Sequence, residues 1–143
     1  MHLDDNFQNR ISLIFLHVSF LFIKLKTTNN KKYYLNFYQK IFDIIFKQID
    51  LNMREIGYSD TTINKNMRFL VKSFYDILIN CESYNKKSLK DKNSFLTKVL
   101  KQNVDKNGNN NNLLLNYFNK YHSFCLDLSL DSVLKGNVNF TYN

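Results

Sequence analysis

The sequence predicts a single all-α domain over residues 1–143, a bundle of about five helices with a short extended C-terminal tail. Of its 143 residues 44% are hydrophobic, which is enough to build one core without disulfides or metals. Proline is absent and glycine occurs three times, whereas sandwiches and barrels need many turns that favour these residues. Apolar residues also recur at steps of three and four, the period of an amphipathic helix.

The first predicted helix is built on an apolar run over 11–23, ISLIFLHVSFLFI, which Lys24 and Lys26 follow. Crossing a membrane takes roughly 20 apolar residues, so this run is too short, and no basic cluster precedes it as in a signal peptide. A buried core helix is the favoured interpretation, and a helix lying in a membrane interface is the alternative. His17 is expected to be a packed core histidine, because no His/Cys/Asp spacing indicates a metal site.

The second predicted helix runs from about Tyr33 to Ile56, and its two apolar stripes predict a central, buried helix. The main stripe consists of Tyr38, Phe42, Ile45, Ile49, Met53 and Ile56, and the second of Phe37, Ile41 and Ile44. Gly57 follows at the position where a left-handed residue commonly ends a helix.

A third helix is predicted to continue to about Glu82, with Asp60 or Thr61 as its N-cap. Its core stripe consists of Ile63, Met67, Leu70, Phe74, Leu78 and Cys81. Ser88 and Asp91 resemble a capping box and predict the start of a fourth helix. The inward residues of this fourth helix are Phe95, Leu96, Val99 and Leu100.

The segment 105–112, DKNGNNNN, predicts a mobile loop, because glycine and asparagine favour turns and offer nothing to bury. A fifth helix is expected after it. Its seam consists of Leu114, Tyr117, Tyr121, Phe124 and Leu128. The tail from Val133 to Tyr142 alternates apolar and polar residues and is expected to lie extended against the bundle.

The formal net charge of +8 favours anionic partners, which include nucleic acid, acidic lipid headgroups and acidic proteins. Cys81 and Cys125 fall on apolar faces of separate predicted helices and have no CxxC spacing. They are interpreted as buried thiols of a protein in a reducing compartment, with a reactive or paired role as the alternative.

The segment between the second and third helices carries the residues most suited to a binding role. Arg54 lies in the last turn of its helix, near Asp60, so two interpretations stand together: a clamp that fixes the corner, and a contact with a partner chain. Glu55 lies beside it. Tyr75 has a polar tip and is either an interface anchor or a partly buried core residue.

Lys65, Arg68 and Lys72 share one stripe of the third helix, at i, i+3 and i+7. The stripe is either a solvated helix face or an electrostatic docking surface. Lys98 and Lys101 are expected to add to it.

The same region resembles the ubiquinol–cytochrome c chaperone family, the assembly factors for cytochrome b of the bc1 complex. The residues that carry the resemblance are Phe42-Asp43, Asp50, the run from Met53 to Gly57, Asp60, Lys65, Arg68 and Phe74-Tyr75. The family pattern is approximately D-x-x-L-R-E-M-G-V-G-D, a basic stretch and F-Y-G-R. Near the end, Leu134-Lys135-Gly136 with Val138 and Phe140 is similar to the family's closing L-x-x-G-x-V-x-F.

Two positions depart from that pattern. Asp76-Ile77 stands where Gly-Arg is typical, which puts in doubt any role for an arginine there. Thr141 occupies the place of a proline, which removes only a local stiffening. The resemblance covers roughly 42–142 and extends weakly over the apolar run 11–23, where a His-containing apolar helix that ends in basic residues is expected of the family.

The resemblance implies a non-catalytic chaperone that binds newly made cytochrome b, or another subunit of the bc1 complex, and needs no cofactor or metal. The expected partner-binding residues are Arg54, Glu55, Asp60, Lys65, Arg68, Lys72 and Tyr75. The lack of a targeting sequence predicts a bacterial cytoplasmic protein, peripheral at the inner membrane and in contact with its anionic surface.

Two other classes of function remain open from the sequence. A small basic helical nucleic-acid binder would explain the charge, but the basic residues are mostly lysine and no helix-turn-helix pattern is evident, so no nucleic acid is expected as a partner. A membrane-surface adaptor would use the first helix. An enzyme is not expected, since Asp43, Asp50 and Glu55 are spread along one helix without a histidine, and no glycine-rich phosphate loop exists.

Overall fold

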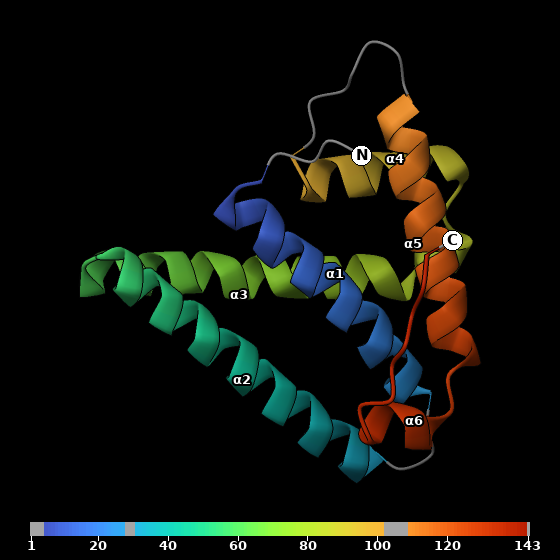
Figure 1. Cartoon of the computed structure of the whole chain (residues 1–143), viewed down its shortest axis with the longest axis horizontal. Coiled ribbons are helices and arrows are strands. Elements are labelled where there is room, and N and C mark those ends of the chain that lie inside the picture. Colours follow the sequence, from blue (N-terminus) through green and yellow to red (C-terminus); the bar gives the residue numbers. More distant parts are fainter. Residues whose placement is uncertain (1–4, 28–30, 102–108, 143) are drawn as a thin grey trace.

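The computed structural model describes residues 5–27, 31–101 and 109–142, and these residues form α-helices, one 3₁₀ turn and connecting segments (Figure 1). The elements are α1 (Phe7–Lys26), α2 (Lys31–Ile56), α3 (Asp60–Glu82), η1 (Tyr84–Lys86), α4 (Leu89–Val99), α5 (Asn109–Asp127) and α6 (Leu130–Leu134). The predicted all-α bundle is confirmed, and α6 is a short helix at the start of the predicted tail.

The loop predicted over 105–112 lies in part outside the described residues. From Asn109 onward the chain is helical, so the prediction was wrong over 109–112. The asparagines there form the first turn of α5, ahead of its apolar seam. The low helix propensity of asparagine was overridden here, because one turn of weak helix formers costs little free energy when a long amphipathic helix follows.

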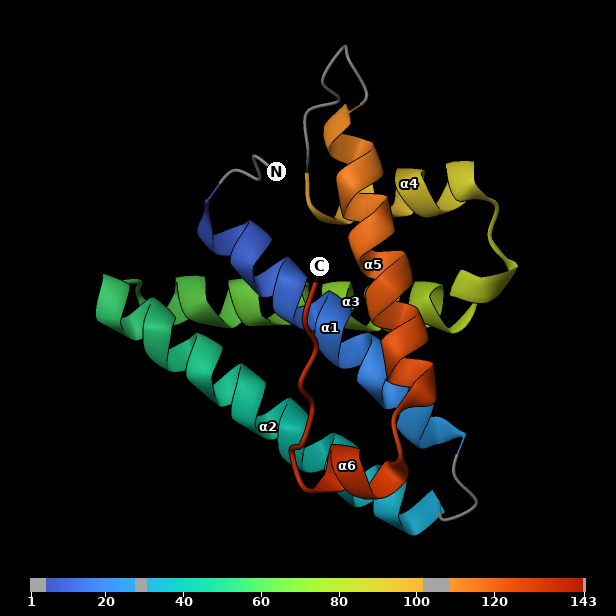
Figure 2. The ribbon, with the colours of Figure 1, turned by 45° about the vertical axis from the view of Figure 1, so that its right-hand side comes forward.

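The helix at the centre of the molecule is α1, which contacts α2, α3, α5 and α6 (Figures 1 and 2). Nine of its residues are buried: Asn9, Ile11, Ser12, Phe15, Leu16, Ser19, Phe20, Phe22 and Leu25. The interpretation of this segment as a core helix is therefore confirmed, and α1 does not have a free apolar face to lay on a membrane. Nothing in the described ranges is both long and apolar enough to span a bilayer.

The prediction that the second helix is central was wrong. In α2 only Phe46, Ile49 and Met53 are buried, and the helix lies at the edge of the bundle in both ribbon views. Ile44 and Ile56, which belong to the two predicted stripes, are 64% and 60% exposed. Charged side chains recur along the outer face of α2 and need water, so this face cannot be covered by another helix.

Aromatic rings form the centre of the core where α1, α2 and α3 meet. The Phe15 ring lies 5.6 Å from that of Phe46 and 5.1 Å from that of Phe74, between ring centroids. Phe42 packs against the same two rings, at 4.4 Å from Phe46 and 5.7 Å from Phe74. Edge-to-face and offset rings of this kind are favourable beyond the area they bury.

The tail beyond α6 has no regular secondary structure and runs back along the bundle (Figure 2). Phe140 anchors it on α5, with its ring centroid 5.6 Å from Tyr117, 5.2 Å from Tyr121 and 5.2 Å from Phe124. The predicted extended tail against the bundle is confirmed for the residues after α6. Gly136, with φ of 73°, ends α6 in the left-handed region and turns the chain into the tail.

The helix caps follow the sequence with one shift. The N-cap of α3 is Ser59, whose hydroxyl accepts a hydrogen bond from the Thr62 N–H, in place of the predicted Asp60 or Thr61. Asp60 instead occupies the first turn, where a carboxylate is favoured by the helix dipole. The helix start predicted at Ser88 is confirmed, since its Oγ accepts a hydrogen bond from the Asp91 N–H at 3.1 Å and donates one to the Asp91 carboxylate at 2.7 Å.

The central position of α1 gives a stability prediction with a matched control on the same helix. Phe15 is fully buried, whereas the adjacent Ile14 is 45% exposed. We expect Phe15→Ala to lower the free energy of unfolding by about 3–5 kcal/mol, because a large cavity is left in the aromatic core. Ile14→Ala is expected to cost less than about 1 kcal/mol. Urea denaturation followed by circular dichroism measures both, and equal losses would contradict the arrangement.

Candidate partner-binding surface

The corner between α2 and α3 is fixed by backbone hydrogen bonds around Gly57. The Gly57 N–H donates to the Arg54 carbonyl at 2.9 Å, and the Tyr58 N–H donates to the Met53 carbonyl at 3.1 Å. This pair of bonds is a Schellman motif, and it requires the φ of 97° that Gly57 adopts. The predicted role of Gly57 as the left-handed residue that ends the helix is confirmed.

Arg54 ties the two helices together across this corner. Its Nε donates to Asp50 at 2.8 Å, one turn back on α2, and its Nη1 donates to Asp60 at 2.5 Å, in the first turn of α3. Hydrogen bonds to Asp50 first, and then to Asp60, raise the pKa of the guanidinium above its ordinary value. The predicted clamp between Arg54 and Asp60 is confirmed, and Asp50 is a second partner that the sequence interpretation had not paired with it.

Glu55 follows Arg54 but takes no part in the clamp. Its side chain is exposed, and it makes no ion pair with any residue that the structure describes. A carboxylate in the last turn of a helix is disfavoured by the helix dipole. The corner therefore presents one neutralised arginine and one carboxylate without a local structural role.

The cationic stripe of α3, defined by Lys65, Arg68 and Lys72, is exposed along its whole length. Within the described ranges none of the three forms an ion pair, although Arg54, Lys26 and Lys135 do. The stripe therefore presents three uncompensated positive charges to solvent.

Tyr75 is a partly buried core residue, one of the two roles predicted for it, and its role as an interface anchor stays a prediction. Its side chain is 44% exposed, while its ring packs 6.2 Å from Phe42 and 5.9 Å from Phe74, between centroids. One edge of the ring thus belongs to the contact between α2 and α3, and the other faces solvent beside the stripe.

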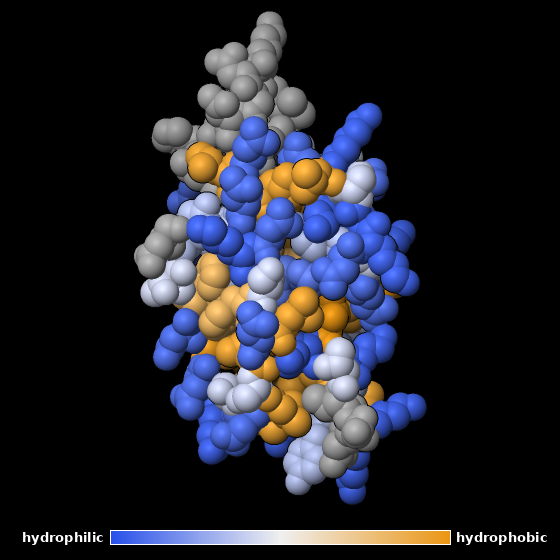
Figure 3. All heavy atoms as spheres, turned by 90° about the vertical axis from the view of Figure 1, so that its right-hand side faces the viewer, coloured by the Kyte–Doolittle hydropathy of each residue, from blue (hydrophilic) through white to orange (hydrophobic). Residues whose placement is uncertain are grey.

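The face around α5 is covered mainly by hydrophilic side chains with smaller hydrophobic areas between them (Figure 3).

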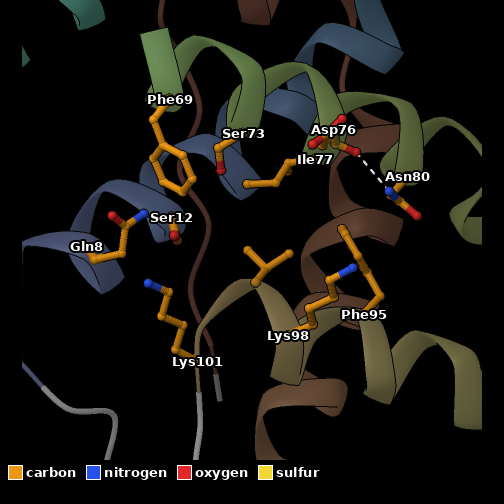
Figure 4. Close-up of a pocket in the computed structure, with 11 residues that line it drawn as sticks. Gln8, Ser12, Phe69, Ser73, Asp76, Ile77, Asn80, Phe95, Lys98 and Lys101 are labelled. Carbon is orange, nitrogen blue, oxygen red and sulfur yellow. Dashed lines mark hydrogen bonds between the residues drawn. The ribbon is translucent and has the colours of Figure 1, made fainter. Parts of the chain in front are cut away.

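Lys98 and Lys101 lie across a groove from α3, the helix that carries the cationic stripe. They line a groove of about 500 Å³ between α1, α3 and α4, where they lie opposite Phe69, Ser73 and Asp76 of α3 (Figure 4). The sequence interpretation missed this groove and its exposed aromatic side chain, Phe69. A signal was present, because Phe69 is an apolar residue that falls outside the core stripe of its helix.

His17 is a packed side chain between α1 and α5, as predicted. Its Nδ1 donates to the Leu13 carbonyl at 2.6 Å, which leaves Nε2 to accept from the Tyr117 hydroxyl at 2.8 Å. The Tyr121 ring stacks edge-on at 4.6 Å from the imidazole. Burial lowers the pKa of His17, against a smaller opposing effect of the Leu13 carbonyl, and the ring is held neutral.

The two cysteines are buried, and the carboxylates of Asp43 and Asp50 are hydrogen-bonded to neighbouring side chains. Cys81 and Cys125 are buried and free, as predicted, and burial raises the pKa of the Cys125 thiol to about 11. Thiols of this kind are poor nucleophiles. Asp43 accepts a hydrogen bond from Gln39, and Asp50 is paired with Arg54. Among the described residues, no three His, Cys, Asp or Glu side chains gather closely enough to hold a metal ion.

A family model described as Ubiquinol-cytochrome C chaperone matches residues 1–140. The chain belongs to the ubiquinol-cytochrome C chaperone family. Membership gives it a chaperone role in the assembly of the bc1 complex and confirms the resemblance seen in the central and closing motifs. The match also covers α1, over which the resemblance extended only weakly. No curated protein and no solved structure matches the chain significantly.

The ion pairs of Arg54 give a prediction for this chaperone. In a double-mutant cycle of Arg54→Ala and Asp60→Asn, we expect a favourable coupling energy, because the guanidinium bridges two helices. The coupling should shrink as sodium chloride is raised, since both side chains are exposed and salt screens them. The free energy of unfolding from urea titrations at low and high salt measures it. A coupling that is zero at low salt would refute the clamp.

The two packed histidines give a pH prediction. Burial lowers the pKa of both His17 and His122, and Lys92 lowers that of His122 further. The unfolded chain, with ordinary histidines near pH 6.5, therefore binds more protons than the folded chain below that pH. We expect the contribution of these histidines to the free energy of unfolding to be fully present above about pH 6.5. It should be lost as the pH is lowered through their depressed pKa values.

Urea titrations at intervals from about pH 7.5 to 5 measure this dependence, a window above the ordinary carboxylate range. His17→Gln keeps a donor and an acceptor but does not titrate, so it should flatten the slope. A slope of the opposite sign, or one that His17→Gln leaves unchanged, would contradict the burial of a neutral imidazole.

Proposed function

We propose that this chaperone binds newly made cytochrome b, without catalysis, and holds it during maturation into the bc1 complex. The contact surface of the proposal consists of Arg54, Glu55, Asp60, Lys65, Arg68, Lys72 and Tyr75. The family supplies the assembly role, and the physical features of this surface support the choice of these residues.

The observation that carries the proposal is the cationic stripe of α3. Its three charges have no partner within the described structure, and exposed apolar side chains lie on the same helix: Phe69 is 57%, Tyr75 44% and Ile79 62% exposed. Contiguous exposed apolar groups beside unpaired charges are typical of a surface that another molecule covers. A positively charged chain favours a partner with acidic segments, and the charges speed the encounter.

The corner supports this role by being rigid. The Schellman motif at Gly57 and the Arg54 bridge between Asp50 and Asp60 fix how α2 meets α3. A surface that is already in its binding conformation loses less entropy on association. In this proposal Arg54 and Asp60 shape the surface, whereas Glu55 and the stripe make the contacts.

The proposed place of action is the inner face of a bacterial respiratory membrane, where cytochrome b is inserted. The charge of +8 favours peripheral contact with anionic lipid there. The chaperone would reach the membrane through surface charge, because α1 is the central core helix.

Charge reversal of the stripe tests the proposal in a strain whose own gene is deleted. We expect the triple variant Lys65→Glu, Arg68→Glu and Lys72→Glu to recover roughly tenfold less cytochrome b on tag purification than the original chain, because three attractions become repulsions. Spectroscopic haem b content and bc1 activity should fall in parallel.

The matched control reverses three exposed lysines elsewhere, Lys40, Lys47 and Lys90, with the same change in net charge. It should retain recovery of cytochrome b. Equal losses in the two variants would assign the effect to net charge and not to the stripe. Failure of the original chain to recover cytochrome b, with normal bc1 levels in the deletion strain, would refute the proposed function itself.

A further inference from the structure

A groove of about 500 Å³ lies between α1, α3 and α4, on the side of α3 next to the cationic stripe. Its floor combines apolar and small polar side chains: Ile77 is 3% and Ser12 2% exposed, and Phe95, Val99 and Ser73 are half-buried. The rim is exposed and polar, with Asp76 on α3 and Lys98 and Lys101 on the opposite side (Figure 4).

The two rims carry different charges. Lys98 projects from α4, and Lys101 extends from the end of that helix toward Gln8 and Ser12 of α1 (Figure 4). Lys101 has φ of 43°, an uncommon conformation for a residue with a Cβ atom, and it places this second cation at the mouth of the groove. No ion pair engages either lysine within the described structure.

Phe69 stands at the α3 edge of the groove with 57% of its surface exposed. On a helix, positions four apart are neighbours, so Phe69 adjoins Lys65 and Asp76 adjoins Lys72. The groove and the cationic stripe are therefore one continuous surface. A large aromatic side chain at the edge of an apolar groove is the kind of residue that dominates binding energy in protein interfaces.

We propose that this groove receives an amphipathic helical segment of the client protein, with its apolar face on Phe69, Ile77 and Val99 and its acidic side chains toward Lys98 and Lys101. Apolar side chains within a groove that has polar rims match the helix-in-groove mode of recognition. This inference rests on the proposed function and assigns its contact to a site outside the seven residues named above.

The absence of tryptophan from the chain allows a direct reporter. Phe69→Trp in the full-length protein places one indole at the groove, and Ile44→Trp places one on α2, outside the groove, at a position that is 64% exposed. The probes are overlapping 20-residue peptides of cytochrome b, in which any tryptophan is replaced by phenylalanine. We expect peptides with an apolar face and acidic residues to shift the emission of Phe69→Trp to the blue and to leave Ile44→Trp unchanged.

Charge reversal tests the contact between the acidic side chains of the segment and the two lysines. Adding Lys98→Glu and Lys101→Glu to the reporter should weaken peptide binding at least tenfold, whereas the control pair Lys86→Glu and Lys90→Glu should weaken it less than threefold. Absence of a shift with every peptide, equal shifts of both reporters, or affinity unchanged by the Lys98 and Lys101 reversals would overturn the inference. A blue shift with anionic phosphatidylglycerol vesicles, and none with peptides, would assign the groove to lipid and also overturn it.

The two proposals fail separately. If the original chain recovers cytochrome b from cells while the reporter stays silent, the groove inference is overturned and the proposed function stands. If the original chain recovers no cytochrome b, the proposed function fails, and the assignment of the groove to that client falls with it.

Discussion

Phe15 and Phe22 on α1 meet Phe74 on α3, and this contact between aromatic rings determines where the other elements lie. The same cluster receives α2 through Phe46, while the opposite side of α1 holds α5 through His17. A helix packed on several sides excludes water from the whole core. The outer helices can then expose charged and apolar residues that the core does not need.

That division explains why the candidate binding features gather on α3. Its inner face buries Ile63, Leu70 and Phe74 and packs against α1, and this packing holds the helix in place. Its outer face carries Lys65, Lys72 and other side chains that contribute nothing to the core. The Gly57 corner fixes one end of the helix, and the connection through η1 leads into α4, which forms the far wall of the groove. A fixed helix with an unused face suits a protein whose role is to hold another.

Local features could be predicted from the sequence because their causes are local. Gly57 follows the last apolar residue of a helical period and adopts the left-handed conformation that ends a helix. Arg54 lies four residues after Asp50 and six before Asp60. Which helix lies at the centre of the bundle could not be predicted in this way. Both α1 and α2 are apolar on more than one face, and only the three-dimensional packing shows that α1 is covered while Ile44 of α2 stays exposed. The groove was missed for the same reason, since its walls come from three helices that are distant in sequence.

The hydrogen bond between His17 and Tyr117 joins side chains that are 100 residues apart. Contacts of such long range form late, because the intervening chain must first be closed into a loop. During synthesis, α1 leaves the ribosome well before α5 exists to cover its second face. The apolar side chains on the side of α1 that faces α5 therefore stay uncovered until nearly the whole chain has been translated.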